Sequence, residues 1–160
     1  MTHETITSRF TQLIAALAFA TAQAHATDRR IVIDIAARKL FLLEDNTIRK
    51  TYDTAVGKAT TPSPEGTFTI VNRIPHPTWY GSGRPVAPGK SNPLGTRWLG
   101  LSAPGYGIHG TNNPASIGTA ASKGCIRMRN RDVEELFELV GPGVTVELVG
   151  TRPVTAVAAE

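Results

Sequence analysis

Residues 106–127 read YGIHGTNNPASIGTAASKGCIR and contain the only cysteine of the chain. His109 and Cys125 are 125 − 109 = 16 positions apart, each at the edge of a short apolar run typical of a β-strand. The loop between them is rich in Gly, Asn, Ser and Thr and can fold back to bring the imidazole to the thiol. An adjacent imidazole takes the thiol proton and stabilises the reactive thiolate. The spacing fits a cysteine nucleophile with a histidine base, and it equally fits a tight turn around a buried, inert cysteine.

Glycine and basic residues lie next to this cysteine. Gly124 has no side chain, so the amides near Gly124 and Cys125 can approach an acyl oxygen and form an oxyanion hole. The basic residues around the thiol are Lys123, Arg127, Arg129 and Arg131. Positive charge lowers the pKa of a thiol, and arginine can hold a carboxylate through two parallel hydrogen bonds. We expect Gly124, Lys123 and Arg127 to contact substrate and the two later arginines to form a solvated turn.

The remaining candidate ligands do not suggest a metal or a cofactor. After residue 26, the only other histidine is His76, which lies between two prolines in a long irregular stretch and is interpreted as a surface residue. His76, His109 and Cys125 do not have the spacing of zinc ligands. No glycine-rich phosphate loop follows a strand. The sequence therefore predicts neither a metal nor a cofactor.

The first 26 residues have the features of a secretory signal peptide. Arg9 supplies positive charge, an apolar run covers residues 13–20, and Ala24-His25-Ala26 places small residues at a cleavage site. The run is shorter than the roughly 20 apolar residues that span a bilayer. We expect export to the periplasm or cell wall without a membrane anchor; an ordinary N-terminal helix is the alternative.

Net charge argues against one class of partner. The formal charge is +4, without a block of like charges or a basic stripe interleaved with aromatic residues. No nucleic-acid partner is expected, and the oligomeric state is not predicted. One cysteine cannot form an internal disulfide, so the fold must depend on its apolar core.

Alternating apolar residues predict a mainly β fold. Strand-like runs occur at residues 31–35, 40–43, 47–56, 67–72, 98–102, 106–110 and 144–149. One segment is typical of a helix, with Asn130 as its expected N-cap and Gly141 just past its end. Its apolar face consists of Val133, Leu136, Phe137 and Val140. We expect one domain over residues 27–150, a β-rich sandwich or barrel with one short helix, followed by a flexible tail at 151–160.

A long irregular segment interrupts the strands. Residues 74–95 contain five prolines and four glycines and have no periodicity. Loops of this length in compact domains usually serve a site or are disordered. Trp79 and Tyr80 would suit a flap over a substrate, whereas the rest of the composition suits a mobile surface loop. Both interpretations remain open.

The motif around Cys125 resembles the YkuD-type L,D-transpeptidase catalytic domain. That family has His-Gly-Thr, a loop of about fifteen residues, and then Ser-His-Gly-Cys followed by an aliphatic residue and Asn or Arg. The matching residues here are His109-Gly110-Thr111 and Ser122-Lys123-Gly124-Cys125-Ile126-Arg127. Flanking segments at 64–68, 92–95 and 98–101 also resemble the family. Lys123 departs from the commonest motif, which has a second histidine that can relay protons near neutral pH.

The resemblance implies a YkuD-like β-rich fold and a reaction on peptidoglycan stem peptides. Cys125 would attack the third residue of a tetrapeptide stem, release D-alanine and form a thioester that an amine of a neighbouring stem resolves into a 3→3 cross-link. His109 would act as base and then as acid, oriented by the backbone carbonyl of Gly110. Carbapenems typically inactivate such enzymes through the same thiol.

Four rival functions remain open. Water as acceptor would make the protein an L,D-carboxypeptidase, and a protein lysine would make it an anchoring enzyme. A wall-binding module with a vestigial site would not require both His109 and Cys125. A secreted cysteine protease would usually need a longer chain and an Asn or Asp that orients the histidine.

Overall fold

Strands dominate the computed structural model, which describes residues 28–81 and 83–150 and contains one α-helix in that part of the chain. The expected signal peptide and tail lie outside the described residues. The strands are β1 (Arg29–Asp34), β2 (Lys39–Glu44), β3 (Thr47–Asp53), β4 (Val56–Gly57), β5 (Gly66–Pro75), β6 (Arg97–Leu101), β7 (Gly107–His109), β8 (Ala120–Ser122), β9 (Ile126–Arg127) and β10 (Thr145–Val149). The helices are α1 (Asn130–Leu139) and the short 3₁₀ helix η1 (Pro114–Ser116). The expected mainly β fold with one short helix is confirmed.

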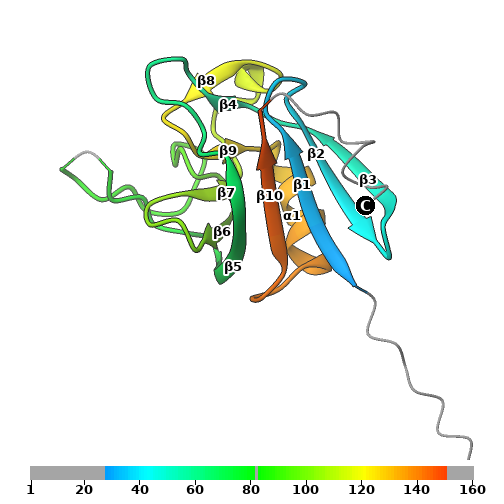
Figure 1. Cartoon of the computed structure of the whole chain (residues 1–160). Coiled ribbons are helices and arrows are strands. Elements are labelled where there is room, and N and C mark those ends of the chain that lie inside the picture. The colour runs from blue at the N-terminus through cyan, green and yellow to red at the C-terminus, as the bar shows by residue number, and fades with distance from the viewer. Residues whose placement is uncertain (1–27, 82, 151–160) are drawn as a thin grey trace, which may run out of the picture.

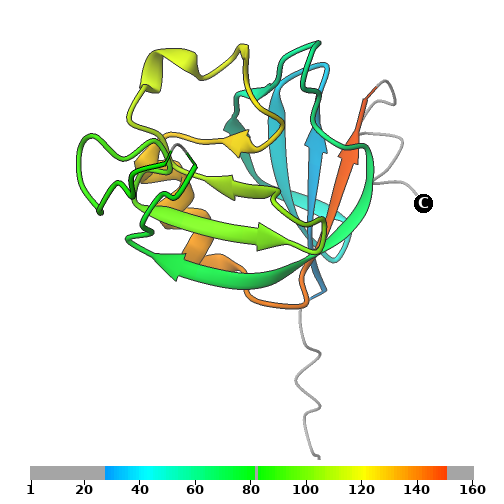
Figure 2. The same ribbon diagram turned by 90° about the vertical axis from the view of Figure 1, so that its left-hand side faces the viewer.

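One curled sheet forms most of the domain. Eight strands pair in the order β3-β2-β1-β10-β5-β6-β7-β9, while β4 and β8 pair separately. The first and last described strands, β1 and β10, lie side by side and parallel in this sheet. Figures 1 and 2 show β5, β6 and β7 curling over α1 while β1, β2 and β3 continue on the other side. The sheet therefore wraps around a single helix as a half-barrel.

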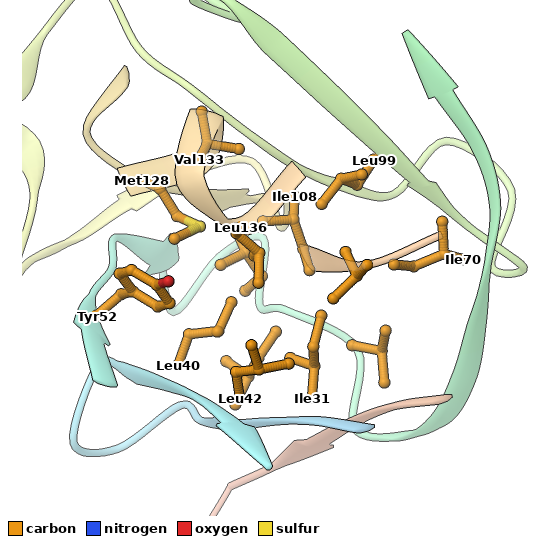
Figure 3. Packing of buried hydrophobic residues seen from close by; sticks show 14 of the residues in the cluster. Ile31, Leu40, Leu42, Tyr52, Ile70, Leu99, Ile108, Met128, Val133 and Leu136 are labelled. Atoms are coloured by element: carbon orange, nitrogen blue, oxygen red, sulfur yellow. The ribbon is translucent and has the colours of Figure 1, made fainter. Parts of the chain in front are cut away.

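The core fills the space between the two halves of this sheet. Figure 3 shows side chains of β1 and β2 pointing toward those of α1, β6 and β7. The fully buried members with the largest side chains include Ile31, Leu42, Ile70, Leu99, Ile108, Met128 and Leu136. Each buried side chain of this size contributes about 1.5–3 kcal/mol of hydrophobic free energy.

The helix has the expected apolar face but not the expected cap. Val133, Leu136 and Phe137 are buried, as their spacing predicts. Arg129, in extended backbone conformation, is the N-cap, and Asn130 is the first helical residue. The prediction of Asn130 as N-cap is therefore wrong, because its side-chain oxygen accepts a hydrogen bond from another segment.

Several strand boundaries differ from the sequence-based prediction. The strand expected over 47–56 divides into β3 and β4, and β5 continues to Pro75, three residues past its expected end. The short strand β8, made of alanine and serine, was not predicted, whereas β9 corresponds to the apolar run expected beside Cys125. These two strands hold the ends of the turn that carries Cys125. No helix in the described part of the chain is long and apolar enough to cross a bilayer.

Candidate active site

Parallel pairing of β7 with β9 places His109 and Cys125 on one face of the sheet. Ile108 pairs with Ile126 and His109 with Arg127. Continuing this register back by one residue sets Cys125 opposite Gly107. Side chains two positions apart in a strand share a face, so Cys125 and His109 are diagonal neighbours. The intervening pair, Ile108 and Ile126, points the other way and is buried in the core.

Three contacts hold His109 in place. Its Nδ1 lies 2.6 Å from the carbonyl oxygen of Gly110. Its own carbonyl accepts a hydrogen bond of 2.8 Å from the Met128 amide. The Trp98 ring stacks on the imidazole with 5.7 Å between centroids and an interplanar angle of 21°. Only 5% of His109 is exposed, so little freedom remains for the ring.

The charge state of this imidazole follows from its burial. Burial lowers the pKa of His109 to about 4, and the nearby positive charge of Arg127 acts in the same direction. The hydrogen bond to Gly110 opposes this shift without overcoming it. A carbonyl oxygen can only accept, so Nδ1 carries the proton and Nε2 is the unprotonated nitrogen of the neutral ring. At neutral pH the ring is therefore a base with Nε2 available.

Cys125 is half-buried, and its thiol is not ionised in the resting site. The Sγ–H donates to the carbonyl oxygen of Gly105 at 3.6 Å. Burial raises the pKa of Cys125, although a backbone hydrogen bond from Gly107 and the charge of Arg127 act to lower it. The charge of Arg127 therefore acts on the thiol pKa in the expected direction, but burial is the larger effect and the net shift is upward. The resting pair is a neutral thiol beside a neutral imidazole.

This charge state predicts how the thiol reacts with a small alkylating reagent. Iodoacetamide reacts with the thiolate, so we expect slow labelling of Cys125 at pH 7 and a rate that rises about tenfold per pH unit up to at least pH 8.5. Mass spectrometry of the adduct against pH measures this, with N-acetylcysteine as reference. A rate that is already constant below pH 7 would show a preformed thiolate–imidazolium pair instead.

The turn before Cys125 is built around a buried hydroxyl. The Ser122 Oγ accepts from the Gly124 amide at 2.9 Å and donates to the Cys125 carbonyl at 2.6 Å. Gly124 has φ +114°, and a Cβ there would lie 2.6 Å from the ring of Tyr106. Glycine is therefore needed both for the backbone conformation and for the space. Because its amide is bonded to Ser122, Gly124 does not offer a free donor for an oxyanion hole in this structure.

The basic residues around the thiol have different environments. Arg129 forms ion pairs with Asp53 at 3.2 Å and Asp132 at 3.7 Å, and Arg131 pairs with Asp132 at 3.0 Å. These two arginines form a surface network, consistent with the solvated turn expected for them. Lys123 is exposed, and Arg127 is half-buried beside the Cys/His pair. Within the described residues, no ion pair is formed by either Lys123 or Arg127.

An apolar groove opens at Cys125. Its volume is about 460 Å³, and it is lined by Ile74, Pro77, Thr78, Trp79, Tyr80, Gly81, Leu94, Trp98, Gly105 and Cys125. Most of these residues come from the long irregular segment, which projects from the domain beside β5 and β6 (Figure 1). Tyr80 is 75% exposed. The structure thus supports the interpretation of residues 74–95 as a flap beside a site.

Backbone pairing and one buried asparagine give this flap a defined shape. Trp79 and Val86 exchange two backbone hydrogen bonds of 2.9 and 2.8 Å. Asn92, fully buried, donates from Nδ2 to the carbonyls of Pro77, Val86 and Ala87 and accepts the Leu94 amide at Oδ1. One side chain therefore connects both arms of the flap.

Sequence reasoning missed several residues of this site. Trp98 was expected only as a strand residue, Ser122 only as part of a motif, and Asn92 only as part of a flanking segment. The one sequence signal for Asn92 is its place in a segment rich in proline and glycine, where a side-chain amide can replace missing backbone pairing. His76 is exposed, as expected of a surface residue. No group of three metal-ligating side chains occurs in the described residues.

A buried histidine and a single cysteine on one sheet face, at the end of an apolar groove, define a candidate cysteine enzyme. The family model of the L,D-transpeptidase catalytic domain, YkuD, matches residues 28–149. The chain belongs to this family. The YkuD protein of Bacillus licheniformis is 48% identical over 119 residues, covering 74% of this chain and 64% of that protein. The YkuD protein of Bacillus subtilis is 48% identical over 118 residues with the same coverage. The chain thus spans less than two thirds of the length of these relatives.

Solved structures support the same assignment. The catalytic domain from an Enterococcus faecium L,D-transpeptidase aligns with a TM-score of 0.63 and 28% identity, covering 78% of this chain and 99% of that domain. An L,D-transpeptidase from Mycobacterium smegmatis aligns with a TM-score of 0.66 over 78% of this chain and 59% of that protein. Its identity of 21% supports the fold alone. The YkuD-like fold expected from the sequence is confirmed.

Proposed function

We propose that the protein is an L,D-transpeptidase that cross-links peptidoglycan tetrapeptide stems through a thioester on Cys125. The observation that carries this proposal is the neutral His109 ring, which shares a sheet face with Cys125 and whose Nδ1 is bound to the Gly110 carbonyl. Nε2 is then the nitrogen that can take the thiol proton. In this arrangement the Gly110 carbonyl orients the histidine, as the Asp carboxylate does in Ser-His-Asp sites.

Acylation converts the stem peptide into a thioester. The Sγ–H proton moves to Nε2 of His109 as Sγ attacks the carbonyl carbon of the third stem residue. The amide bond to the terminal D-alanine breaks, and His109 returns the proton to the departing amine. D-Alanine leaves with a neutral amino group, and Cys125 holds the acyl group. The thiol need not be ionised beforehand, which suits a raised pKa.

Transfer to a second stem restores the enzyme. The side-chain amine of a neighbouring stem attacks the thioester carbonyl and loses its proton to Nε2 of His109. The carbon–sulfur bond breaks, the sulfur takes the proton back, and a 3→3 cross-link remains. The apolar walls of the groove, Trp79 and Trp98 among them, exclude water on one side of the thioester. This favours an amine over water as acceptor.

Positive and polar groups around Cys125 support substrate binding. Arg127 and Lys123 offer charge to a stem carboxylate, since neither forms an ion pair within the described residues. The amide of Cys125 is the remaining candidate for stabilising the acyl oxygen, since that of Gly124 is bonded to Ser122.

Peptidoglycan lies outside the cytoplasm, and we propose export by a signal peptide at residues 1–26. We further propose that residues 27–150 form the catalytic domain.

Product analysis with disaccharide-tetrapeptide muropeptides tests this function. We expect mass spectrometry to show release of D-alanine and a dimer one alanine short of two tetrapeptides, and neither product with Cys125→Ala. Tripeptide without dimer would reassign the protein as an L,D-carboxypeptidase using the same residues. Transfer only to a protein lysine would make it an anchoring enzyme. Unchanged substrate, with a folded sample and a titratable thiol, would favour a wall-binding module.

A further inference from the structure

One peptide group beside the candidate base is hydrogen-bonded at both of its ends. The carbonyl oxygen of Gly110 lies 2.6 Å from Nδ1 of His109. The amide of Thr111, which belongs to the same peptide group, donates to Oδ1 of Asn130 at 3.0 Å. A continuous chain therefore leads from the imidazole through the peptide group to a side chain of α1.

The sequence leaves room for this asparagine at two glycines. A Cβ at Gly95 would lie 2.1 Å from Oδ1 of Asn130, and a Cβ at Gly110 would lie 2.2 Å from it. Gly95 also has φ +63°, which disfavours other residues. Two segments that are distant in sequence thus lie beside Oδ1 of Asn130. Each has a glycine at the point of closest approach, so no side chain displaces the oxygen.

The contact is not needed to cap the helix. Arg129 occupies the N-cap position, and no side chain caps the amide groups of the first turn. An asparagine at a helix start usually accepts from its own backbone. Here Asn130 accepts from Thr111 instead, which lies 19 residues earlier in the chain. Its side chain therefore holds the backbone segment that follows His109.

We propose that Asn130 is a positioning residue for the base, acting through the Gly110–Thr111 peptide group. The peptide group is planar, so a fixed N–H direction also fixes the direction of its carbonyl. That carbonyl in turn determines which imidazole nitrogen carries the proton and where Nε2 points. Hydrogen bonds in such a chain polarise one another, which strengthens the bond to Nδ1. Asn130 thus orients the imidazole indirectly, through a peptide group. In other cysteine and serine enzymes, a side chain bonded directly to the histidine does this.

Three variants of the full chain separate this role from simple support of the fold. Asn130→Ala removes the acceptor. Asn130→Asp keeps an acceptor and adds a negative charge, and an acidic residue also suits the first turn of a helix. Asn112→Ala is the matched control, because the side chain of Asn112 donates to the Ser91 carbonyl at 3.0 Å and does not contact the base.

Nitrogen-15 NMR of the histidine ring gives a readout that does not depend on activity. We expect a single Nδ1–H tautomer of His109 in wild type and in Asn112→Ala, and a mixture of tautomers in Asn130→Ala. In Asn130→Asp we expect the tautomer to be kept and the pKa of His109 to rise above the wild-type value, because the added carboxylate favours the protonated ring. A wild-type tautomer in the alanine variant, together with an unchanged pKa in the aspartate variant, would overturn the proposal. If Asn130→Ala does not fold, an unchanged pKa in the aspartate variant overturns it alone.

Kinetics then test the consequence for the reaction, which rests on the proposed function. With muropeptide substrate we expect Asn130→Ala to lower kcat about 10- to 100-fold with little change in KM, since misplacing a catalytic group by about 1 Å costs on this order. Asn130→Asp should restore most of the rate. An inactive wild type would count against the proposed function and leave the NMR result intact. An active wild type with an equally active Asn130→Ala variant would count against the role of Asn130.

Discussion

Replacing His109 by alanine is expected to slow acylation of Cys125 by a tetrapeptide stem about 10²- to 10⁴-fold. General acid–base catalysis contributes on this order, and the described residues place no second imidazole on this face. The loss should be large because burial raises the pKa of the thiol, so little thiolate forms without a base. Mass spectrometry of the acyl-enzyme under single-turnover conditions measures the rate directly.

His76→Ala is the matched control for this experiment. His76 is exposed and lies in the flap, so its removal should leave the acylation rate within about twofold of wild type. Circular dichroism should show that both variants keep their strands. If His109→Ala acylates within tenfold of wild type, another group takes the thiol proton, and the proposed mechanism is wrong.

Local patterns were enough to predict the fold class and the pair of candidate residues. The alternation in 31–35 and 40–43 follows directly from burial of one face of a strand, and the helix around Leu136 follows from its 3.6-residue period. His109 and Cys125 could be paired because the chain has one cysteine and few histidines. The strands and the helix follow from neighbours in sequence, whereas the pair of candidates follows from the small number of histidines and cysteines.

Features that depend on contacts between distant segments could not be predicted. Asn130 was expected to cap its own helix, since nothing in the sequence shows that Thr111 lies beside it. The strand β8 forms because its partner β4 is in place, although its own residues, Ala120–Ser122, have low strand propensity. Tertiary context overrides local preference in both cases.

Two opposing effects act on the pKa of the Cys125 thiol, and the sequence reveals only one of them. The sequence shows the charges near Cys125, and these do act to lower its pKa. It does not show how deeply β7, β9 and the flap enclose the sulfur. Burial is the larger effect and raises the pKa. The same enclosure lowers the pKa of His109. Both shifts therefore favour the neutral thiol and the neutral imidazole over a thiolate–imidazolium ion pair.

Buried His109 should also make the fold sensitive to mild acid. The pKa of His109 is about 4 in the folded protein, whereas an unfolded histidine titrates near 6.5. Below pH 6.5 the unfolded chain binds a proton that the folded protein does not, so the free energy of unfolding falls as the pH drops toward 4. The loss reaches about 2 kcal/mol at pH 5 and about 3 kcal/mol at pH 4. Urea unfolding at pH 7, 6 and 5 measures it.

His109→Gln isolates this effect from other titrating groups. Glu44, Asp53 and Glu135 also have lowered pKa values in the folded protein, because Arg29, Lys39 and Lys50 respectively pair with them. Their contributions are lost at lower pH, mostly below about 4.5, where unfolded carboxylates begin to bind protons. Between pH 7 and 5 the wild type should therefore lose about 2 kcal/mol more than His109→Gln. Equal losses in the two proteins would mean that His109 is protonated as readily in the folded state as in the unfolded one, and its neutral ring could then not be the resting form near pH 5.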